Sequence, residues 1–291
     1  MIHRRESIDG VDISYYTTGK PTAPTVVLLH GGGQTATTWR RVSNVLADRY
    51  YCVAPDLRGH GDTAWHPDGS YTLSGYAEDL RRLLDHLDIH RPHLVGMSLG
   101  GQTSLHAACH GLDVASLTLV DVGPRLVAGG GARISDFLAV TSYPSFEAAL
   151  DSAAEFSPKR TRQSLAESLT RSMRQQADGT WTWKWDPRRA ASRDERARQA
   201  ELLWPLLDQI RSSVLIVRGA DSPLFSSELA RDLCDTMQAN GIAATLVTVA
   251  GAGHAVQTDQ PDELAQILDG FFSENARASG VEADHHEMRN Q

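Results

Sequence analysis

One short run constrains the fold of this chain more than any other: Leu94-Val95-Gly96-Met97-Ser98-Leu99-Gly100-Gly101. It places a serine in the pattern Gly-x-Ser-x-Gly, after an apolar run and before a helix-forming stretch that ends at Gly111. A serine hydroxyl is a weak nucleophile, so it needs an exposed place on a sharp turn, near a base and amide N–H donors. The pattern therefore predicts a nucleophile at Ser98, on a turn from a strand into a helix.

Strand-like and helical stretches alternate along most of the chain. The strand-like runs are short and rich in apolar residues, and they fall at residues 11–16, 25–29, 51–54, 94–95, 117–120, 214–217 and 244–249. Between them helical faces repeat every three or four residues, as Trp39, Val42 and Leu46 do. Such alternation predicts an α/β fold with a mainly parallel sheet and helices on both of its faces.

The alternation of strand-like and helical stretches stops between Pro124 and about Ser212, where several helical faces follow one another. We therefore expect a core over residues 1–123 and 213–275, interrupted by an inserted, mainly helical lid over residues 124–212. The remaining residues, 276–291, are polar and lack periodicity, which predicts a disordered tail.

A tryptophan-rich segment lies inside the insert. Trp181-Thr182-Trp183-Lys184-Trp185 alternates with period two, which is typical of a short hairpin or an edge strand. Its three tryptophans form a large apolar surface on one side. They either attach the lid to the core or roof a substrate pocket, and we assign Trp183 to substrate binding. An exposed apolar lid surface would also suit a homodimer.

Charge and composition exclude several partners. The 291 residues carry a formal net charge of −8 and no basic patch with interleaved aromatic residues, so we expect no nucleic acid. The charged N-terminal residues and the lack of about eighteen consecutive apolar residues predict a cytoplasmic protein without membrane contact. Three widely spaced cysteines predict buried free thiols. The adjacent His285 and His286 lack the spacing of a metal motif, so we expect no metal.

A serine nucleophile needs a base, and His254 is the best placed of the twelve histidines. It lies in Gly251-Ala252-Gly253-His254-Ala255, directly after the last strand-like run and before the last helical stretch. A glycine-rich loop at the carboxyl end of a strand can carry an imidazole over the edge of the sheet where the serine lies. We therefore expect His254 to be the general base.

The imidazole in turn needs an acid that fixes its tautomer and stabilises its charged form. Asp221 follows the penultimate strand-like run, and the order Ser98, Asp221, His254 along the chain is serine, acid, histidine. Asp121, which ends the strand after the serine, and Asp56, which follows an earlier strand, are the alternatives. We choose Asp221.

An oxyanion hole requires two N–H groups that converge on the reacting carbonyl oxygen. One is expected from Leu99, directly after the nucleophile. The other is expected from the loop His30-Gly31-Gly32-Gly33-Gln34, whose glycines let backbone amides approach a ligand closely. We choose Gly32 as the donor, with Gly33 as the alternative, and place Gly31 and Gly33 among the substrate-binding residues. The Lys-Ser/Thr pair of a phosphate-binding loop is missing.

Taken together, these motifs resemble the α/β-hydrolase superfamily, in its lid-bearing esterase, lactonase and haloperoxidase-like branch. The resemblance covers about residues 10–273 and rests on His30-Gly31-Gly32 with Trp39, Asp56-Leu57-Arg58-Gly59-His60-Gly61-Asp62, the serine turn, Gly219-Ala220-Asp221 and Gly253-His254. It implies an eight-stranded, mostly parallel sheet and a structural role for residues 56–62. Most relatives have histidine before the nucleophile. Here Met97 takes that place, which makes the pocket floor more apolar, so we count it as substrate-binding.

The resemblance also implies a reaction. Ser98, Asp221 and His254 would hydrolyse a small or medium carboxylic ester, lactone or thioester through an acyl-enzyme, with no metal or other cofactor. The only partner implied is the small-molecule substrate. Hydrolysis of a carbon–carbon bond in a vinylogous diketone is chemically close and stays open, as does a non-hydrolytic binding or cyclase role on the same scaffold.

Overall fold

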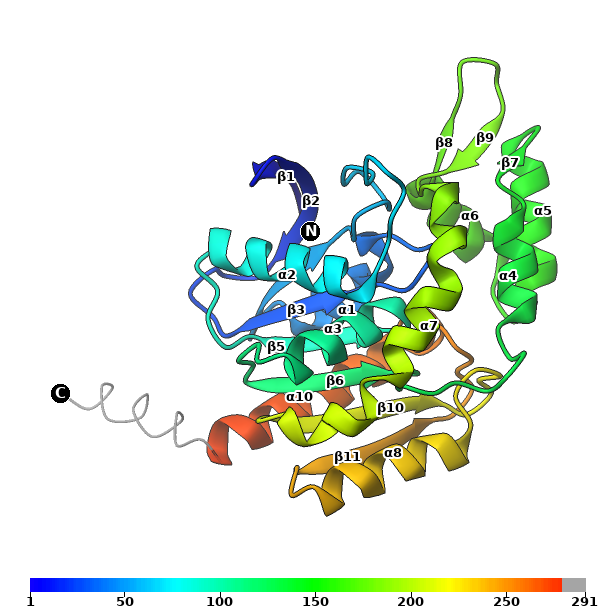
Figure 1. The fold of residues 1–291 in the computed structure, drawn as a ribbon. Coiled ribbons are helices and arrows are strands. Elements are labelled where there is room, and N and C mark those ends of the chain that lie inside the picture. Colours follow the sequence, from blue (N-terminus) through cyan, green and yellow to red (C-terminus); the bar gives the residue numbers. More distant parts are fainter. Residues whose placement is uncertain (279–291) are drawn as a thin grey trace.

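The computed structural model describes residues 1–278, and an eight-stranded sheet lies at its centre (Figure 1). The strands are β1 (Ile2–Ile8), β2 (Val11–Thr18), β3 (Thr25–Leu29), β4 (Tyr51–Pro55), β5 (His93–Met97), β6 (Ser116–Val120), β10 (Ser213–Gly219) and β11 (Ala244–Val249). Their order across the sheet is β1-β2-β4-β3-β5-β6-β10-β11. The pairs β1–β2 and β2–β4 are antiparallel and all others are parallel. The predicted mostly parallel α/β sheet is thus confirmed.

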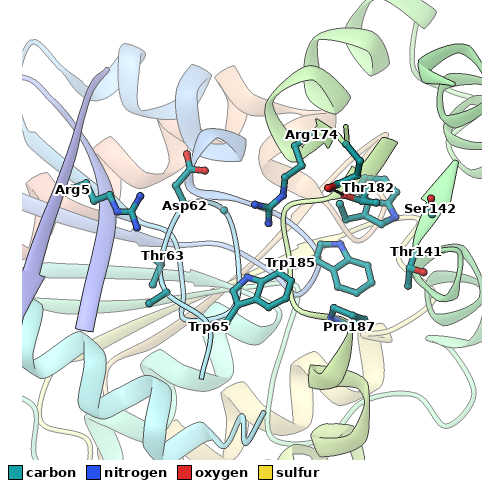
Figure 2. A pocket seen from close by; sticks show the side chains of 14 residues that line it. Arg5, Asp62, Thr63, Trp65, Thr141, Ser142, Arg174, Thr182, Trp185 and Pro187 are labelled. Carbon is teal, nitrogen blue, oxygen red and sulfur yellow. Dashed lines mark hydrogen bonds between the residues drawn. The ribbon is translucent and has the colours of Figure 1, made fainter. Parts of the chain in front are cut away.

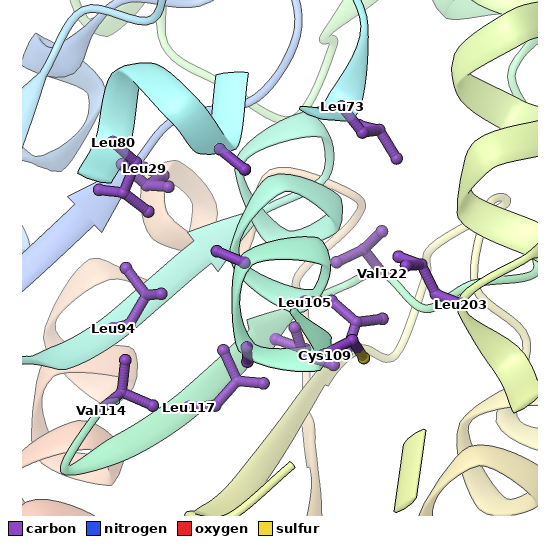
Figure 3. Packing of buried hydrophobic residues seen from close by; sticks show 14 of the residues in the cluster. Leu29, Leu73, Leu80, Leu94, Leu105, Cys109, Val114, Leu117, Val122 and Leu203 are labelled. Carbon is purple, nitrogen blue, oxygen red and sulfur yellow. The ribbon is translucent and has the colours of Figure 1, made fainter. Parts of the chain in front are cut away.

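Helices cover both faces of this sheet because its central strands are apolar on both sides. In β3, Val27 and Leu29 belong to one buried cluster, whereas Val26 and Leu28 belong to the other. The first cluster packs under α2 (Leu73–His86), α3 (Leu99–Cys109) and α8 (Ser227–Ala239), and Figure 3 shows part of it around α3. The second packs under α1 (Arg40–Leu46) and α10 (Pro261–Ala278). Two short helices, η1 (Ala36–Trp39) and α9 (Val256–Asp259), complete the core.

The segment between β6 and β10 forms a separate layer at one end of the sheet (Figure 1). It contains α4 (Ala132–Ala139), β7 (Ser142–Tyr143), α5 (Phe146–Phe156), α6 (Arg162–Ser172), β8 (Met173–Gln175), β9 (Trp181–Trp183), η2 (Pro187–Ser192), α7 (Arg193–Glu201) and η3 (Trp204–Gln209). The tryptophan-rich segment supplies β9, which pairs antiparallel with β7 and β8 and is the middle strand of the three. Of the hairpin and the edge strand that its alternation indicated, the structure has the hairpin, with β8. The elements α4 to α6 and β7 to β9 have an apolar cluster of their own, whereas Ala200 of α7 and Leu207 of η3 belong to the first cluster of the core. All of these elements lie within the lid predicted at 124–212, although the domain limits stay a prediction.

The C-terminal helix is longer than the sequence suggested. α10 continues through Ala278, so the expectation of disorder is wrong for residues 276–278. The rest of that segment, with His285 and His286, lies outside the described residues.

Among residues 1–278, no helix combines the length and the apolar character that crossing a bilayer requires. The three cysteines, Cys52, Cys109 and Cys234, are buried free thiols, as predicted.

Candidate active site

Ser98 lies on a strained turn between β5 and α3. Its backbone has φ 51° and ψ −116°, a conformation that non-glycine residues rarely adopt outside functional sites. Close backbone approaches surround it. A Cβ on Gly96 would overlap the carbonyl of Gly100, and a Cβ on Gly100 would overlap the carbonyl of Leu29. The two glycines of the motif are therefore required by packing, and the turn that they permit is the one predicted for a nucleophile.

Asp121 lies beside this turn, at the end of the neighbouring strand. Met97 pairs with Val120 across β5 and β6, so the next residues, Ser98 and Asp121, leave the sheet side by side. The Asp121 carboxylate is fully buried and accepts three hydrogen bonds. The donors are the amide of Gly219 (2.9 Å), the hydroxyl of Ser222 (2.5 Å) and Nδ1 of His254 (2.7 Å). These donors hold a buried carboxylate next to the imidazole.

The structure does not bring Asp221, the acid chosen from the sequence, into contact with His254. Oδ2 of Asp221 lies 2.7 Å from Nζ of Lys159, which belongs to the insert, and the Asp221 side chain is 47% exposed. β6 and β10 are adjacent parallel strands, so Asp121 and Asp221 reach the same edge of the sheet. The order serine, acid, histidine fits both residues. Ser222, next to Asp221, donates a hydrogen bond to the carboxylate of Asp121.

His254 is oriented by its loop as well as by Asp121. The amide of Gly253 donates to Oδ2 of Asp259 (2.9 Å), and a Cβ on Gly219 would overlap the carbonyl of Gly253. Because Nδ1 faces a carboxylate, it carries the proton, which leaves Nε2 with a free lone pair. The structure thus brings His254 to the strand ends that carry Ser98 and Asp121. The catalytic roles of Ser98 and His254 stay predictions at this point.

The glycine loop after β3 is fixed by the ring of His30. Nδ1 donates to the carbonyl of Gly31 (2.8 Å), while Nε2 accepts from the amide of Leu57 (2.9 Å). Burial lowers the pKa of His30 to about 4, so the ring is neutral and can play both parts at once. A Cβ on Gly31 would come within 3.4 Å of the Cβ of Ser98. The loop is therefore held against the nucleophile turn.

Some backbone amides of the glycine loop and of the start of α3 have no hydrogen-bond acceptor among the described residues, and others have one. The amide of Gly31 already donates to Oε1 of Gln34 (3.1 Å). Within residues 1–278, the amide of Gly32 has no hydrogen-bond acceptor. Leu99 is the first residue of α3, so its amide has no acceptor inside the helix. Gly32 and Leu99 stay the predicted donors of the oxyanion hole. Gly33 has φ 79°, and its α-carbon faces Leu138 of α4, so the insert covers the loop here.

The segment 56–62 has the structural role that the resemblance implied. Asp56 is buried and accepts hydrogen bonds from the amide of Ala36 (2.7 Å), the amide of Asp62 (3.1 Å) and the hydroxyl of Ser14 (3.0 Å). It thereby joins β2, η1 and its own loop. The carboxylate that faces the His254 ring is that of Asp121 and not that of Asp56.

Two residues assigned to substrate binding lie in apolar packing. Met97 is 1% exposed, and a Cβ on Gly31 would meet its sulfur, so it lies beneath the glycine loop. Trp183 is 6% exposed and donates from Nε1 to the carbonyl of Val140 (2.8 Å). With Trp65, Trp185 and others it lines a cleft of about 660 Å³ between the insert and residues 61–65 (Figure 2). Neither Ser98 nor its two partners line that cleft.

Sequence reasoning missed Arg189. It lies on η2 of the insert, 7% exposed, and its Nη1 is 3.7 Å from the position that a Cβ on Gly32 would take. Nothing in the sequence distinguishes it from the adjacent Arg188, whose guanidinium pairs with Asp186 (2.7 Å). Only the fold separates the arginine that faces the glycine loop from the arginine that does not.

Comparison with known proteins agrees with this geometry. The model of the alpha/beta hydrolase family matches residues 26–267, and the chain belongs to this family.

Similar proteins cover nearly the whole chain. Esterase Rv0045c from Mycobacterium tuberculosis is 33% identical over 262 residues, 86% of this chain and 83% of that protein. A 3-hydroxybutyrate-oligomer hydrolase from Cupriavidus necator is 30% identical over 280 residues, 90% of this chain and 92% of that protein. A crystal structure of the mycobacterial esterase superposes with a TM-score of 0.73 at 30% identity, over 94% of this chain and 91% of the other. The crystal structure of E-2-(acetamidomethylene)succinate hydrolase superposes with a TM-score of 0.83 at 24% identity, over 94% of this chain and 99% of the other. This likeness shows the shared fold.

Proposed function

We propose that this chain is a serine esterase that hydrolyses a small or medium carboxylic ester, lactone or thioester through an acyl-enzyme on Ser98. The observation that carries the proposal is the hydrogen bond of 2.7 Å between His254 and the buried Asp121, at the strand end next to the serine turn. A buried carboxylate on Nδ1 is what a histidine base needs in order to take a proton at Nε2. Two relatives named as an esterase and as an oligomer hydrolase support the same reaction class.

In the first half of the reaction, Nε2 of His254 removes the proton of the Ser98 hydroxyl as its oxygen attacks the acyl carbon. The carbonyl oxygen becomes negative and is stabilised by the amides of Gly32 and Leu99. Asp121 stabilises the imidazolium meanwhile. The proton then passes from His254 to the leaving alkoxide, which departs as the alcohol, and the acyl group stays on Ser98.

In the second half, water takes the place of the alcohol. Nε2 of His254 removes a proton from the water as its oxygen attacks the acyl-enzyme. The tetrahedral intermediate collapses, the Ser98 oxygen leaves and takes the proton from His254, and the carboxylic acid departs. Each group thus returns to its starting state.

Labelling with a fluorophosphonate probe tests the nucleophile, and a panel of 4-nitrophenyl esters from acetate to octanoate tests the reaction. The wild type should be labelled and should hydrolyse at least the shorter esters, whereas Ser98→Ala should do neither. His254→Ala should fold and lose both activities. An unlabelled wild type that cleaves no ester would overturn the proposal, and full reactivity of His254→Ala would exclude that residue as the base.

A further inference from the structure

Arg189 is a buried cation without an anion. Its side chain belongs to a residue that is 7% exposed, and Nε is fully enclosed without a hydrogen-bond partner. No oxygen atom in the described part of the chain accepts a hydrogen bond from this guanidinium. Its contact is with the ring of Trp185, whose centroid lies 4.9 Å from Cζ. Burial lowers the pKa of Arg189 to about 10, which leaves the group charged at neutral pH. A buried charge is costly unless something pairs with it.

An acidic residue lies near Arg189 in the sequence but is paired with other side chains. Asp186 lies three residues before Arg189, but it pairs with Arg188 (2.7 Å) and accepts from Tyr71 (2.6 Å). Arg196, the next buried arginine, donates to the backbone carbonyl of Tyr71 (3.0 Å). Both neighbours therefore have acceptors from the protein. The positive charges of Arg196 and Arg193 also lower the pKa of Arg189, and they make its surroundings more attractive to an anion.

The guanidinium points at the catalytic loop. Nη1 lies 3.7 Å from the position of a Cβ on Gly32, and a Cβ on Gly31 would contact that of Ser98. The guanidinium and the Ser98 side chain thus lie against neighbouring glycines of the same loop. Two further donors border on this arginine. Nε1 of Trp185 is buried without an acceptor, and so is the hydroxyl of Tyr76, whose pKa is raised by burial and lowered in part by the charge of Arg189.

We propose that Arg189 binds a carboxylate on the acyl part of the substrate, so that the natural substrates are esters with a free carboxylate, such as half-esters of dicarboxylic acids. This inference rests on the proposed esterase function. A planar guanidinium can bind a carboxylate through two parallel hydrogen bonds, which also orients the acyl chain. The bound substrate would supply the anion that the folded protein lacks.

Matched ester pairs test the inference. Monomethyl succinate, glutarate and adipate are compared with methyl butanoate, pentanoate and hexanoate, which replace the carboxylate with a methyl group. Methanol release gives kcat/KM for each. The wild type should prefer the best half-ester over its neutral partner by about tenfold or more, the usual effect of a charge-assisted hydrogen bond. Equal kcat/KM values within every pair would overturn the inference.

Variants locate the preference. Arg189→Met should abolish the preference for a half-ester over its neutral partner, and Arg189→Lys should keep a part of it. Arg198→Met is the matched control, since Arg198 is on α7 of the same insert, 67% exposed and paired with Glu195. It should keep the full preference. A preference that survives in Arg189→Met would contradict the assignment.

Binding without turnover separates this inference from the esterase proposal. Glutarate or adipate should raise the Tm of Ser98→Ala, which is inactive by design, and should not raise that of Ser98→Ala/Arg189→Met. This result would stand even if no ester were cleaved. Removal of an unpaired buried charge should leave the Tm without ligand unchanged or raise it. A lower Tm of Arg189→Met together with no dicarboxylate effect on Ser98→Ala would show that the arginine is structural.

Discussion

Asp121 accepts three hydrogen bonds in a place closed to solvent, whereas Asp221 is half-exposed and pairs with Lys159 of the insert. The two carboxylates lie at the ends of adjacent strands, so substitutions at them form a natural pair. A buried carboxylate on Nδ1 holds the tautomer in which Nε2 can accept a proton. An amide in its place can present an N–H to the ring and stabilise the wrong tautomer.

Asp121→Asn should therefore reduce kcat for ester hydrolysis by about 10³- to 10⁴-fold, as loss of the acid does in other serine triads. Asp221→Asn should stay within about threefold of wild type, because an exposed ion pair contributes little. Initial rates on 4-nitrophenyl butanoate measure both, and circular dichroism checks that each variant is folded. A large loss of kcat in Asp221→Asn with a small one in Asp121→Asn would instead identify Asp221 as the acid.

Single residues were predictable where a local pattern demands them. Ser98 is marked by its glycines and His254 by a glycine loop after a strand, and the structure brings the two loops together. The acid could not be chosen in this way, because the order along the chain is the same for Asp121 and Asp221. Arg189 carried no signal, since its neighbour Arg188 has the same side chain and only the fold gives the two different surroundings.

At the scale of elements, the crossing of α3 over β3 is set by backbone contact at Gly100. The Cβ of any other residue there would overlap the carbonyl of Leu29. The start of α3 would have to move away from the strand, and the turn that carries Ser98 would move with it. Gly270, on the C-terminal helix, has open space around its α-carbon and provides the contrast.

Gly100→Ala should lower the free energy of unfolding by about 1–3 kcal/mol, the usual cost of an overpacked core position. Gly270→Ala should raise it by about 1 kcal/mol, because alanine is the better helix former and meets nothing. Urea unfolding followed by circular dichroism gives both values. A Gly100→Ala variant as stable as wild type would contradict this prediction. It would mean that α3 can move away from β3 at no cost in free energy.

The strands that the sequence predicted include those buried on both faces, such as β3, which is apolar except for Thr25, and β6, whose residues are all buried. β1 was not predicted, because it is an edge strand with mostly exposed and often charged residues. Its pairing with β2 depends on the turn at Asp9 and Gly10, both with positive φ. In the insert, the sequence left a hairpin and an edge strand as alternatives and did not predict the neighbours of Trp183, since period two does not determine what a strand packs against.

Over the whole molecule, several histidines are packed into the core as neutral rings. His93 at the start of β5 is 7% exposed, stacks on Phe272 of α10 (4.2 Å between centroids) and shares a hydrogen bond with Ser116 (2.8 Å). Burial lowers its pKa to about 4. Between its unfolded value of about 6.5 and about 4, the unfolded chain binds a proton that the folded chain does not. The free energy of unfolding must therefore fall as the pH falls through this window.

Each such ring contributes at most about 1.4 kcal/mol per pH unit to the slope of the free energy of unfolding against pH. His93→Asn should remove one such contribution. The variant should be less stable than wild type at pH 7.5, because it loses the stacking on Phe272, yet its stability should decline less between pH 6.5 and 4. Urea unfolding at half-unit pH steps gives the slopes. The same substitution at His90, whose side chain is 82% exposed, is the control. If the free energy of unfolding fell equally steeply with pH in wild type and His93→Asn, His93 would take up its proton in the folded protein. The contact between His93 on β5 and Phe272 on α10 would then be open to water without unfolding.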